Sequence, residues 1–179
     1  LSPSSTVARK LRRAPGCAPN VLPEVAHSRL IYPTKTARGL VSLDLVDENF
    51  EDLLTRAGHI GRRGRIRQTV WQAEPEHRLW MRNEHDELFC FTYDPTHDAY
   101  GWTRQVLGGR YGVGAPKVES LAVLPDASGR DRLWLRVART NDAGDIVRTI
   151  EVLDPDWSPE LALLDACLHL DAAVVYDGW

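Results

Sequence analysis

The sequence feature that most constrains the fold of this chain is a pattern that occurs twice between Ile66 and Pro155. Each copy has three short apolar runs separated by polar turns, and its middle run begins with Arg-Leu-Trp, at Arg78 and again at Arg132. A fainter copy begins with an Arg-Leu pair at Arg29, so the three pairs are 49 and 54 residues apart. Repeats of about 40–50 residues built from short strands are typical of β-propellers and related arrays. The pattern therefore predicts an all-β fold, in which short antiparallel blades form a partial β-propeller-like array.

The repeats divide the chain into five expected segments. These are an extended N-terminal arm (1–28), a hairpin plus helix forming a degenerate blade (29–64), a first blade (65–110), a second blade (115–157) and a C-terminal segment of strand and helix (158–179). The arm is rich in proline, serine and arginine and has no apolar period. We therefore expect it to pack on neighbouring elements rather than to form part of the core.

Alternating apolar residues and turn signals place the strands. We expect them near 66–72, 77–82, 87–94 and 99–106 in the first blade, and near 118–124, 131–139 and 146–153 in the second. Upstream, the stretch from His27 to Val46 is typical of a hairpin, with a turn in which Gly39 is free to take a positive φ.

One short helix is predicted after that hairpin. Asp47 is a suitable N-cap, and Gly58 is a suitable terminator. The apolar residues between them follow a helical spacing, at Phe50, Leu53, Leu54 and Ala57.

Aromatic and branched residues in the predicted strands suit the half-buried surface of a sheet. We expect the blade cores to contain Trp71, Trp80, Leu88, Tyr93, Leu133, Trp134 and Ile150. An aromatic ladder can also bind sugars or bases, but core packing is favoured because such rings dominate core energetics.

The net charge of −3 conceals an asymmetry along the chain. Residues 1–67 carry 12 Lys/Arg and 6 Asp/Glu, whereas residues 68–179 carry 10 and 19. The basic part suits an acidic partner or nucleic acid, and its candidate partner contacts are Arg9, Lys10, Arg12 and Arg13. The alternative is that these charges only solvate the surface, and the ordinary role of charge favours it.

Two further observations bear on the compartment. No apolar run approaches the 18 or so residues of a membrane-spanning helix, so no membrane anchor is expected. The three cysteines, Cys17, Cys90 and Cys167, are odd in number and far apart. This spacing argues against a disulfide scaffold and fits folding in a reducing compartment.

The sequence contains no recognisable catalytic or metal-binding motif. The histidines do not pair at zinc-ligand spacing, and no Gly-x-Ser-x-Gly elbow occurs. A hydrolase would need two carboxylates that meet in a cleft, and the candidates are Asp86, Glu87, Asp98, Asp154 and Asp156. They lie in predicted turns, where aspartate is expected for turn geometry, so we expect neither catalysis nor a cofactor.

Several short motifs follow one another in a distinctive order. They are Val70-Trp71-Gln72, Leu79-Trp80, Thr92-Tyr93, the run Val118-Glu119-Ser120-Leu121-Ala122-Val123-Leu124-Pro125, Leu133-Trp134-Leu135, Arg139-Thr140, Arg148-Thr149-Ile150-Glu151 and the closing Tyr176-Asp177-Gly178. Over nearly the whole chain this order resembles the tail nozzle proteins of short-tailed phages and related prophages, also called tail tubular protein B. The run from Val118 to Pro125, with the two motifs after it, is the most specific part.

The resemblance implies a structural role in the virion tail. Members of this family form a homohexameric ring below the portal and adaptor proteins, carry a propeller-like platform and contact tail fibres or a tail needle. They line the channel through which double-stranded DNA leaves, and they assemble in the cytoplasm of the bacterial host. The acidic 68–179 part would suit such a lumen, because like charge lets DNA slide.

Family members are several times longer, so the resemblance implies a piece of a larger subunit, a split gene product or a reduced relative. The main alternative from the residues alone is a stand-alone β-propeller-like module that binds protein or glycan. An exposed aromatic cluster on one face would favour that alternative.

Overall fold

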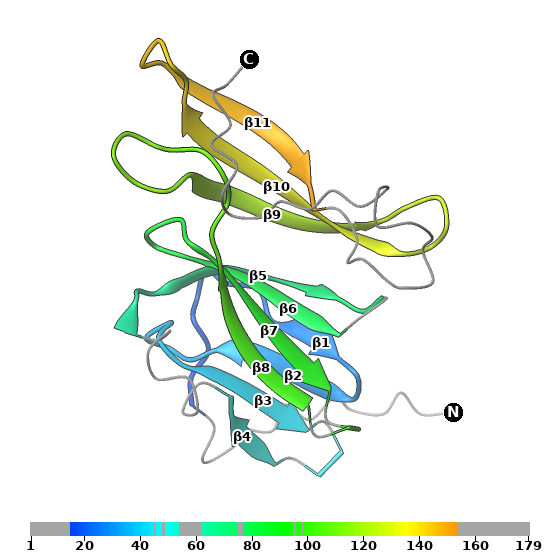
Figure 1. The fold of residues 1–179 in the computed structure, drawn as a ribbon. Coiled ribbons are helices and arrows are strands. Elements are labelled where there is room, and N and C mark those ends of the chain that lie inside the picture. The colour runs from blue at the N-terminus through cyan, green and yellow to red at the C-terminus, as the bar shows by residue number, and fades with distance from the viewer. Residues whose placement is uncertain are drawn as a thin grey trace, which may run out of the picture.

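The computed structural model describes residues 15–44, 46–47, 49–53, 62–74, 77–94, 96–97 and 99–153. Within these residues the chain forms eleven strands in three antiparallel sheets (Figure 1). The expected all-β fold class is therefore confirmed.

Each sheet is a meander, in which strands that follow one another in sequence also pair. The first sheet has the order β1-β2-β3-β4, with β1 (Glu24–Ala26), β2 (Arg29–Pro33), β3 (Leu40–Asp44) and β4 (Phe50–Asp52). The second has the order β5-β6-β7-β8, with β5 (Ile66–Gln72), β6 (Arg78–Asn83), β7 (Leu88–Asp94) and β8 (Ala99–Gln105). The third has the order β11-β10-β9, with β9 (Lys117–Pro125), β10 (Asp131–Thr140) and β11 (Ile146–Val152).

The seven strands predicted for the two strong repeats are confirmed, each to within about two residues, and so is the first hairpin. The second and third sheets correspond to the two copies of the repeat. The turns of the third sheet explain why its strands are predicted accurately. Gly129 and Gly144 have φ values of 82° and 89° and close short loops between β9, β10 and β11. The short connections keep neighbouring strands in register without help from distant parts of the chain.

The three sheets stack in chain order, and the second sheet lies between the other two (Figure 1). Alternating residues of β6 face opposite ways. Leu79 and Met81 pack with the first sheet, in a cluster that contains Ile31 and Leu40. Trp80 faces the other way and packs with the third sheet. Both faces of the second sheet are therefore buried, which accounts for the nearly continuous burial of β6 and β7.

The first strands of successive sheets are neighbours, since β1 contacts β5 and β5 contacts β9. Sheets that approach one another at their first strands radiate from a common line, as the blades of a propeller do. Among the described residues the three sheets do not close into a barrel.

The prediction of a helix is wrong for the part of that segment that the structure describes. Phe50–Asp52 forms β4, which pairs with β3 through Leu43 opposite Phe50 and Val41 opposite Asp52. Cross-strand packing of Phe50 against Leu43 outweighs the local helical spacing. The remainder of the predicted helix, within 54–61, lies outside the described residues.

The expectation that the arm stays outside the core is wrong for residues 15–28. Ala18, Val21 and Ala26 are buried in the cluster between the first two sheets, and Ala26 belongs to β1. Small apolar side chains allow this segment to lie close to the second sheet. Residues 1–14 and the predicted 158–179 segment lie outside the described residues.

The first hairpin turn also differs from expectation. Ala37, with a φ of 56°, takes the left-handed conformation, and Gly39 does not. Gly39 is needed for another reason, because a Cβ there would lie 2.9 Å from Cγ2 of Thr34.

Candidate functional site

The second and third sheets are joined by a side-chain amide that pairs like a peptide group. Gln68 Nε2 on β5 donates to the carbonyl oxygen of Leu121 at 2.6 Å, and the Leu121 N–H donates to Gln68 Oε1 at 3.1 Å. Arg82 Nε donates to the same Oε1 at 3.2 Å and fixes the orientation of the amide. Because β9 is an edge strand, Gln68 occupies backbone groups that another strand would otherwise pair with.

A second amide links the same two sheets farther along β5. Gln72 Nε2 donates to the carbonyl oxygen of Asp131 at 2.9 Å, while its Oε1 accepts from Trp80 Nε1 at 2.7 Å. The Asp131 carboxylate in turn accepts from the backbone N–H of Ala73 at 2.8 Å. These bonds satisfy the polar atoms of a largely buried contact, which keeps the two sheets in one relative position.

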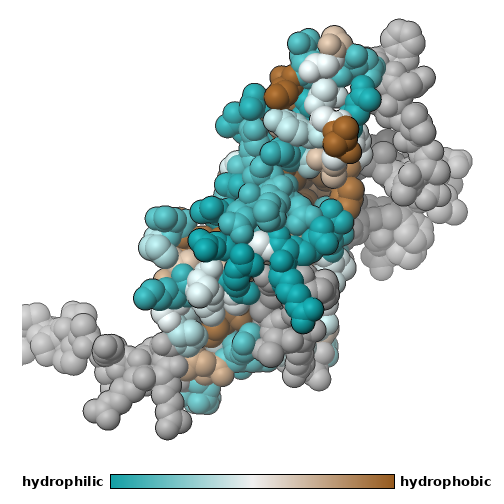
Figure 2. All heavy atoms as spheres, turned by 90° about the vertical axis from the view of Figure 1, so that its left-hand side faces the viewer, coloured by the Kyte–Doolittle hydropathy of each residue, from teal (hydrophilic) through white to brown (hydrophobic). Residues whose placement is uncertain are grey.

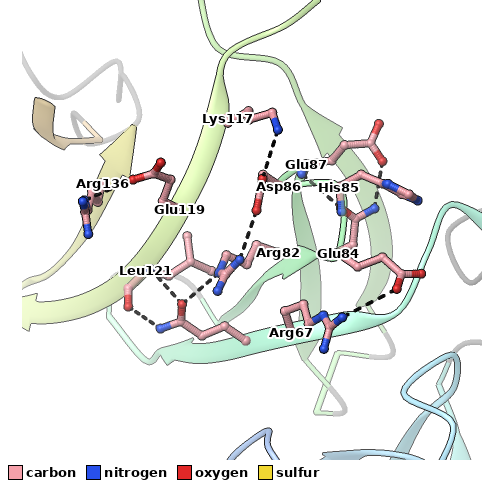
Figure 3. A network of polar contacts seen from close by, with 12 residues as sticks. Arg67, Arg82, Glu84, His85, Asp86, Glu87, Lys117, Glu119, Leu121 and Arg136 are labelled. Atoms are coloured by element: carbon pink, nitrogen blue, oxygen red, sulfur yellow. Dashed lines mark hydrogen bonds and ion pairs between the residues drawn. The ribbon is translucent and has the colours of Figure 1, made fainter. Parts of the chain in front are cut away.

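The turn between β6 and β7 forms the ionic part of this joint (Figure 3). Asp86 has a φ of 62°, and its carbonyl oxygen accepts from the Val118 N–H at 2.9 Å. Its carboxylate lies between Arg82, at 3.2 Å, and Lys117, at 3.7 Å. The turn thus connects β6 of the second sheet to the start of β9 in the third.

Glu87 in the same turn is held by three cationic or amide donors. It pairs with Arg63, with Arg104 at 3.0 Å and with the Asn83 amide at 2.8 Å. Burial raises the pKa of Glu87, but the hydrogen bonds from Arg63 and Asn83 outweigh it, so the pKa lies below its usual value. Glu87 is therefore charged, and it holds the turn through these contacts.

The carboxylates considered for hydrolysis therefore differ from an acid–base pair. The pKa of Glu87 lies below its usual value, whereas a general acid needs a raised pKa. The Asp86 carboxylate is engaged by Arg82 and Lys117. Asp98, Asp154 and Asp156 lie outside the described residues. Among the residues that the structure describes, no group of three or more His, Cys, Asp or Glu is placed to hold a metal ion.

The face of the third sheet that points away from the second sheet, hereafter the outer face, carries exposed apolar side chains. Its inward face is buried through Leu133, Leu135 and Val137, so the alternate residues of β10 point outward. The large exposed apolar residues of the outer face are Leu124, Trp134, Ile146, Ile150 and Val152.

The charges of the outer face are paired within the sheet. Glu119 accepts from Arg136 at 3.2 Å and from Arg148 at 3.0 Å, and Arg132 pairs with Asp126 at 2.8 Å. Figure 2 views the molecule from one side and shows hydrophobic residues at its upper end, where the third sheet lies, among hydrophilic ones. The outer face is therefore an amphipathic surface, apolar in places and crossed by arginines.

A second surface feature is a cluster of rings where β1, β5 and β7 approach. His27 and His77 have ring centroids 4.3 Å apart in an edge-to-face arrangement. Trp71 stacks on His77 with centroids 6.1 Å apart, and Tyr93 lies behind it. His27 is exposed, Trp71 and His77 are half-buried, and Tyr93 is fully buried, so the rings grade from surface to core.

The residues expected in the blade cores fall into two groups. Trp80, Leu88, Tyr93 and Leu133 are buried, and Trp71 is half-buried against the first cluster. The expectation is wrong for Trp134 and Ile150, because they lie on the outer face, which no described sheet covers. Arg9, Lys10, Arg12 and Arg13 lie outside the described residues.

Sequence reasoning missed the amides that join the sheets. Gln68 and Gln72 lie two positions before and two positions after Val70 in β5, and polar residues at such positions of a strand are often solvated. Only the relative position of two sheets distinguishes a joining amide from a solvated one, and no local pattern contains that information.

No protein-family model matches the chain, and no curated protein resembles it closely enough to count as a match. No helix among the described residues has the length and apolar character needed to cross a membrane.

Proposed function

We propose that this chain is a structural component of a bacteriophage tail, part of the nozzle ring that surrounds the DNA exit channel. In this role it assembles with copies of itself, below portal and adaptor proteins, and supports fibres or a needle. It performs no catalysis. The basic residues Arg9, Lys10, Arg12 and Arg13 are the proposed contact with a neighbouring tail protein.

The order of motifs that resembles the nozzle family supports this proposal. Its most specific part, Val118 to Pro125, is β9 with the exception of one residue. The motifs that follow fall on β10 and β11, so the third sheet carries most of that resemblance. Motifs that fall together on one sheet are more specific evidence of a resemblance than short matches scattered along a chain.

The observation that carries the proposal is the stack of three meander sheets, in which the outer face of the last sheet carries exposed apolar side chains that no described sheet covers. Exposed apolar side chains on one face of a sheet commonly mark a site where a further partner binds, so this stack suits a larger assembly. The charged turn at Asp86 and Glu87 joins sheets and shows no arrangement for acid–base chemistry. Both observations favour an assembly component over an enzyme.

The experiment that tests this function is immunogold electron microscopy of phage particles released by the strain that encodes the chain. Antibodies against the chain should label one site per particle, at the tail end of the capsid vertex. Antibodies against the capsid protein are the control for particle integrity. Intact particles that carry no label at the tail would refute the proposal.

A second candidate is the binding module, which the ring cluster favours. The exposed His27 and half-buried Trp71 and His77 offer aromatic faces of the kind that stack on sugar rings. A glycan array probed with the chain and with Trp71→Ala tests it. Binding that Trp71→Ala abolishes would favour the module, and no binding by either protein would exclude glycans as its ligand.

A further inference from the structure

The β6–β7 turn lies among exposed arginines that come from three separate parts of the chain. Arg38 belongs to the turn between β2 and β3, Arg104 belongs to β8, and the others precede β5 or lie near its start. The Ile66 N–H donates to the carbonyl oxygen of Ala37 at 2.7 Å, so the β2–β3 turn lies beside the start of β5. The group, hereafter the arginine patch, consists of Arg38, Arg62, Arg63, Arg65, Arg67 and Arg104.

Two glutamates of the β6–β7 turn gather these arginines. Glu84 lies 3.6 Å from Arg38 and 3.8 Å from Arg67, and it accepts a hydrogen bond from the backbone N–H of Arg65 at 3.0 Å. Glu87 pairs with both Arg63 and Arg104. Each carboxylate is therefore shared by two guanidinium groups and neutralises only one of them.

The arginine patch keeps a positive surplus after these pairs are counted. Its six arginines face two glutamates, which leaves four positive charges. Asp52 lies opposite Val41 near the same end of the first sheet, and counting it still leaves three. Among the described residues Arg62 has no hydrogen-bond or ion-pair partner. The patch can therefore attract an anion from outside the chain.

The paired arginines also keep donors that face water. The side chains of Arg38, Arg63, Arg67 and Arg104 are 41–52% exposed. A guanidinium has five N–H donors in a planar fork, so a carboxylate at one side leaves donors for a second anion. The glutamates hold these side chains in place, so less side-chain entropy is lost when the anion binds.

The composition of the arginine patch favours phosphate groups over a protein partner. The guanidinium fork matches phosphate in a bidentate arrangement, and surfaces that bind nucleic acid are more positive than those that bind protein. Protein interfaces usually have an apolar centre. Of the large exposed apolar residues that the structure describes, only Val106 lies within two residues of a patch member in sequence. Figure 2 accordingly shows mainly hydrophilic side chains across the middle of the face that lies on the left in Figure 1, where the β6–β7 turn is.

A duplex fits the patch better than a single strand does. Proteins that bind single strands stack the bases on aromatic rings, and no Trp, Tyr or Phe belongs to the patch. Charged contacts to the phosphates of a duplex need no such rings.

We propose that the arginine patch binds the phosphate backbone of double-stranded DNA without reading its base sequence. The proposal rests on the charges of the patch and not on the nozzle function, which only requires DNA to pass through a channel. A lumen lined by the acidic 68–179 part would repel DNA, whereas the patch would hold it.

The test measures the fluorescence anisotropy of a short labelled duplex as the 179-residue chain is added, at several salt concentrations between about 50 and 200 mM. Arg62→Ala should weaken binding several-fold at the lowest salt and reduce the slope of log affinity against log salt by about 1. Arg65→Ala should repeat the result, so the test does not depend on one variant folding. Arg130→Ala is the matched control, because Arg130 is also exposed and its β9–β10 turn lies at the opposite end of the strands from the β6–β7 turn (Figure 1).

Three results would overturn this inference. They are a wild-type chain that does not bind the duplex at the lowest salt, an equal loss of binding in Arg130→Ala, and displacement of the duplex by an equal charge concentration of polyglutamate. The last result would assign the patch to an acidic protein. Binding that depends on the patch, together with phage particles that carry no label at the tail, would support the inference and refute the nozzle function.

Discussion

At the scale of single residues, Gln68 shows how an amide can substitute for a strand. Its two hydrogen bonds to the Leu121 backbone connect sheets that share no main-chain ladder. The bonds also close part of the β9 edge, which limits unwanted pairing with other chains.

Gln68→Ala should destabilise the chain by about 1–3 kcal/mol, because Leu121 would keep a buried donor and acceptor without partners. Urea denaturation followed by tryptophan fluorescence measures the loss. Gln105→Ala is the matched control, since Gln105 is exposed and its side chain bonds Thr103, and it should change stability by less than about 0.5 kcal/mol. Equal effects of the two substitutions would show that Gln68 does not join the sheets.

Glu87 gives the β6–β7 turn a dependence on pH. Its pKa is lowered in the folded state, so its contribution is present above the unfolded-state pKa of about 4.3 and is lost as the pH falls through the folded-state pKa. Glu87→Gln should therefore be less stable than the wild type at pH 7, by on the order of 1 kcal/mol. The difference should shrink as the pH falls below about 4.3, and it should vanish only once the pH is below the lowered folded-state pKa, where the wild type also lacks the charge.

Thermal unfolding of the two proteins between pH 3 and pH 7 measures this convergence. Asp142→Asn is the control, because Asp142 is largely exposed and 3.5 Å from Arg110. The difference in melting temperature between Asp142→Asn and the wild type should stay constant between pH 3 and pH 7. A constant gap between Glu87→Gln and the wild type would contradict the assigned charge.

At the scale of elements, the strands were predictable because turns and alternation are local. The short loops at Gly129 and Gly144 fix the β9–β11 meander within one stretch of sequence, and the β5–β8 meander is equally local. The prediction of a helix over Phe50 is wrong for the opposite reason. A three-residue strand is decided by its partner β3, and the helical spacing gives no information about that partner.

The candidate site was less predictable than the strands. Periodicity places Trp134 on the same face of its strand as Arg132 and Arg136, and it places Ile150 between polar residues, but it does not say which sheet, if any, covers them. Burial of Ala26 beside the second sheet was hidden similarly, because the proline-rich stretch before it suggests an arm. Both errors concern packing between sheets, which depends on residues far apart in the chain.

Two glycines test the turn and the strand separately. Gly144 has a φ of 89°, so Gly144→Ala should destabilise the β10–β11 hairpin by about 1 kcal/mol through backbone strain. Gly101 lies inside β8, where an added Cβ would have no neighbouring atom within 4 Å, so Gly101→Ala should be neutral or stabilising by up to about 1 kcal/mol. Chemical denaturation of both variants distinguishes them. A stabilising Gly144→Ala would mean that the turn has a different geometry.

At the scale of the whole molecule, the described residues form a stack of three sheets, and the second sheet packs between the other two. The second sheet is buried on both faces, and the third is buried on one. Joining amides and ion pairs hold these sheets in a fixed relation, so the outer face is presented by a rigid support. The proposed assembly into a ring would use such a fixed unit, whose last sheet has exposed apolar residues that no described sheet covers.

The nozzle function is tested by the native mass of the 179-residue chain, measured with an inventory of the chains that co-purify with it from phage particles. We expect a ring of about six copies that co-purifies with portal-like or fibre-like proteins, with the copy number taken from the family resemblance. A monomer of 20.1 kDa that purifies alone at every concentration would contradict it.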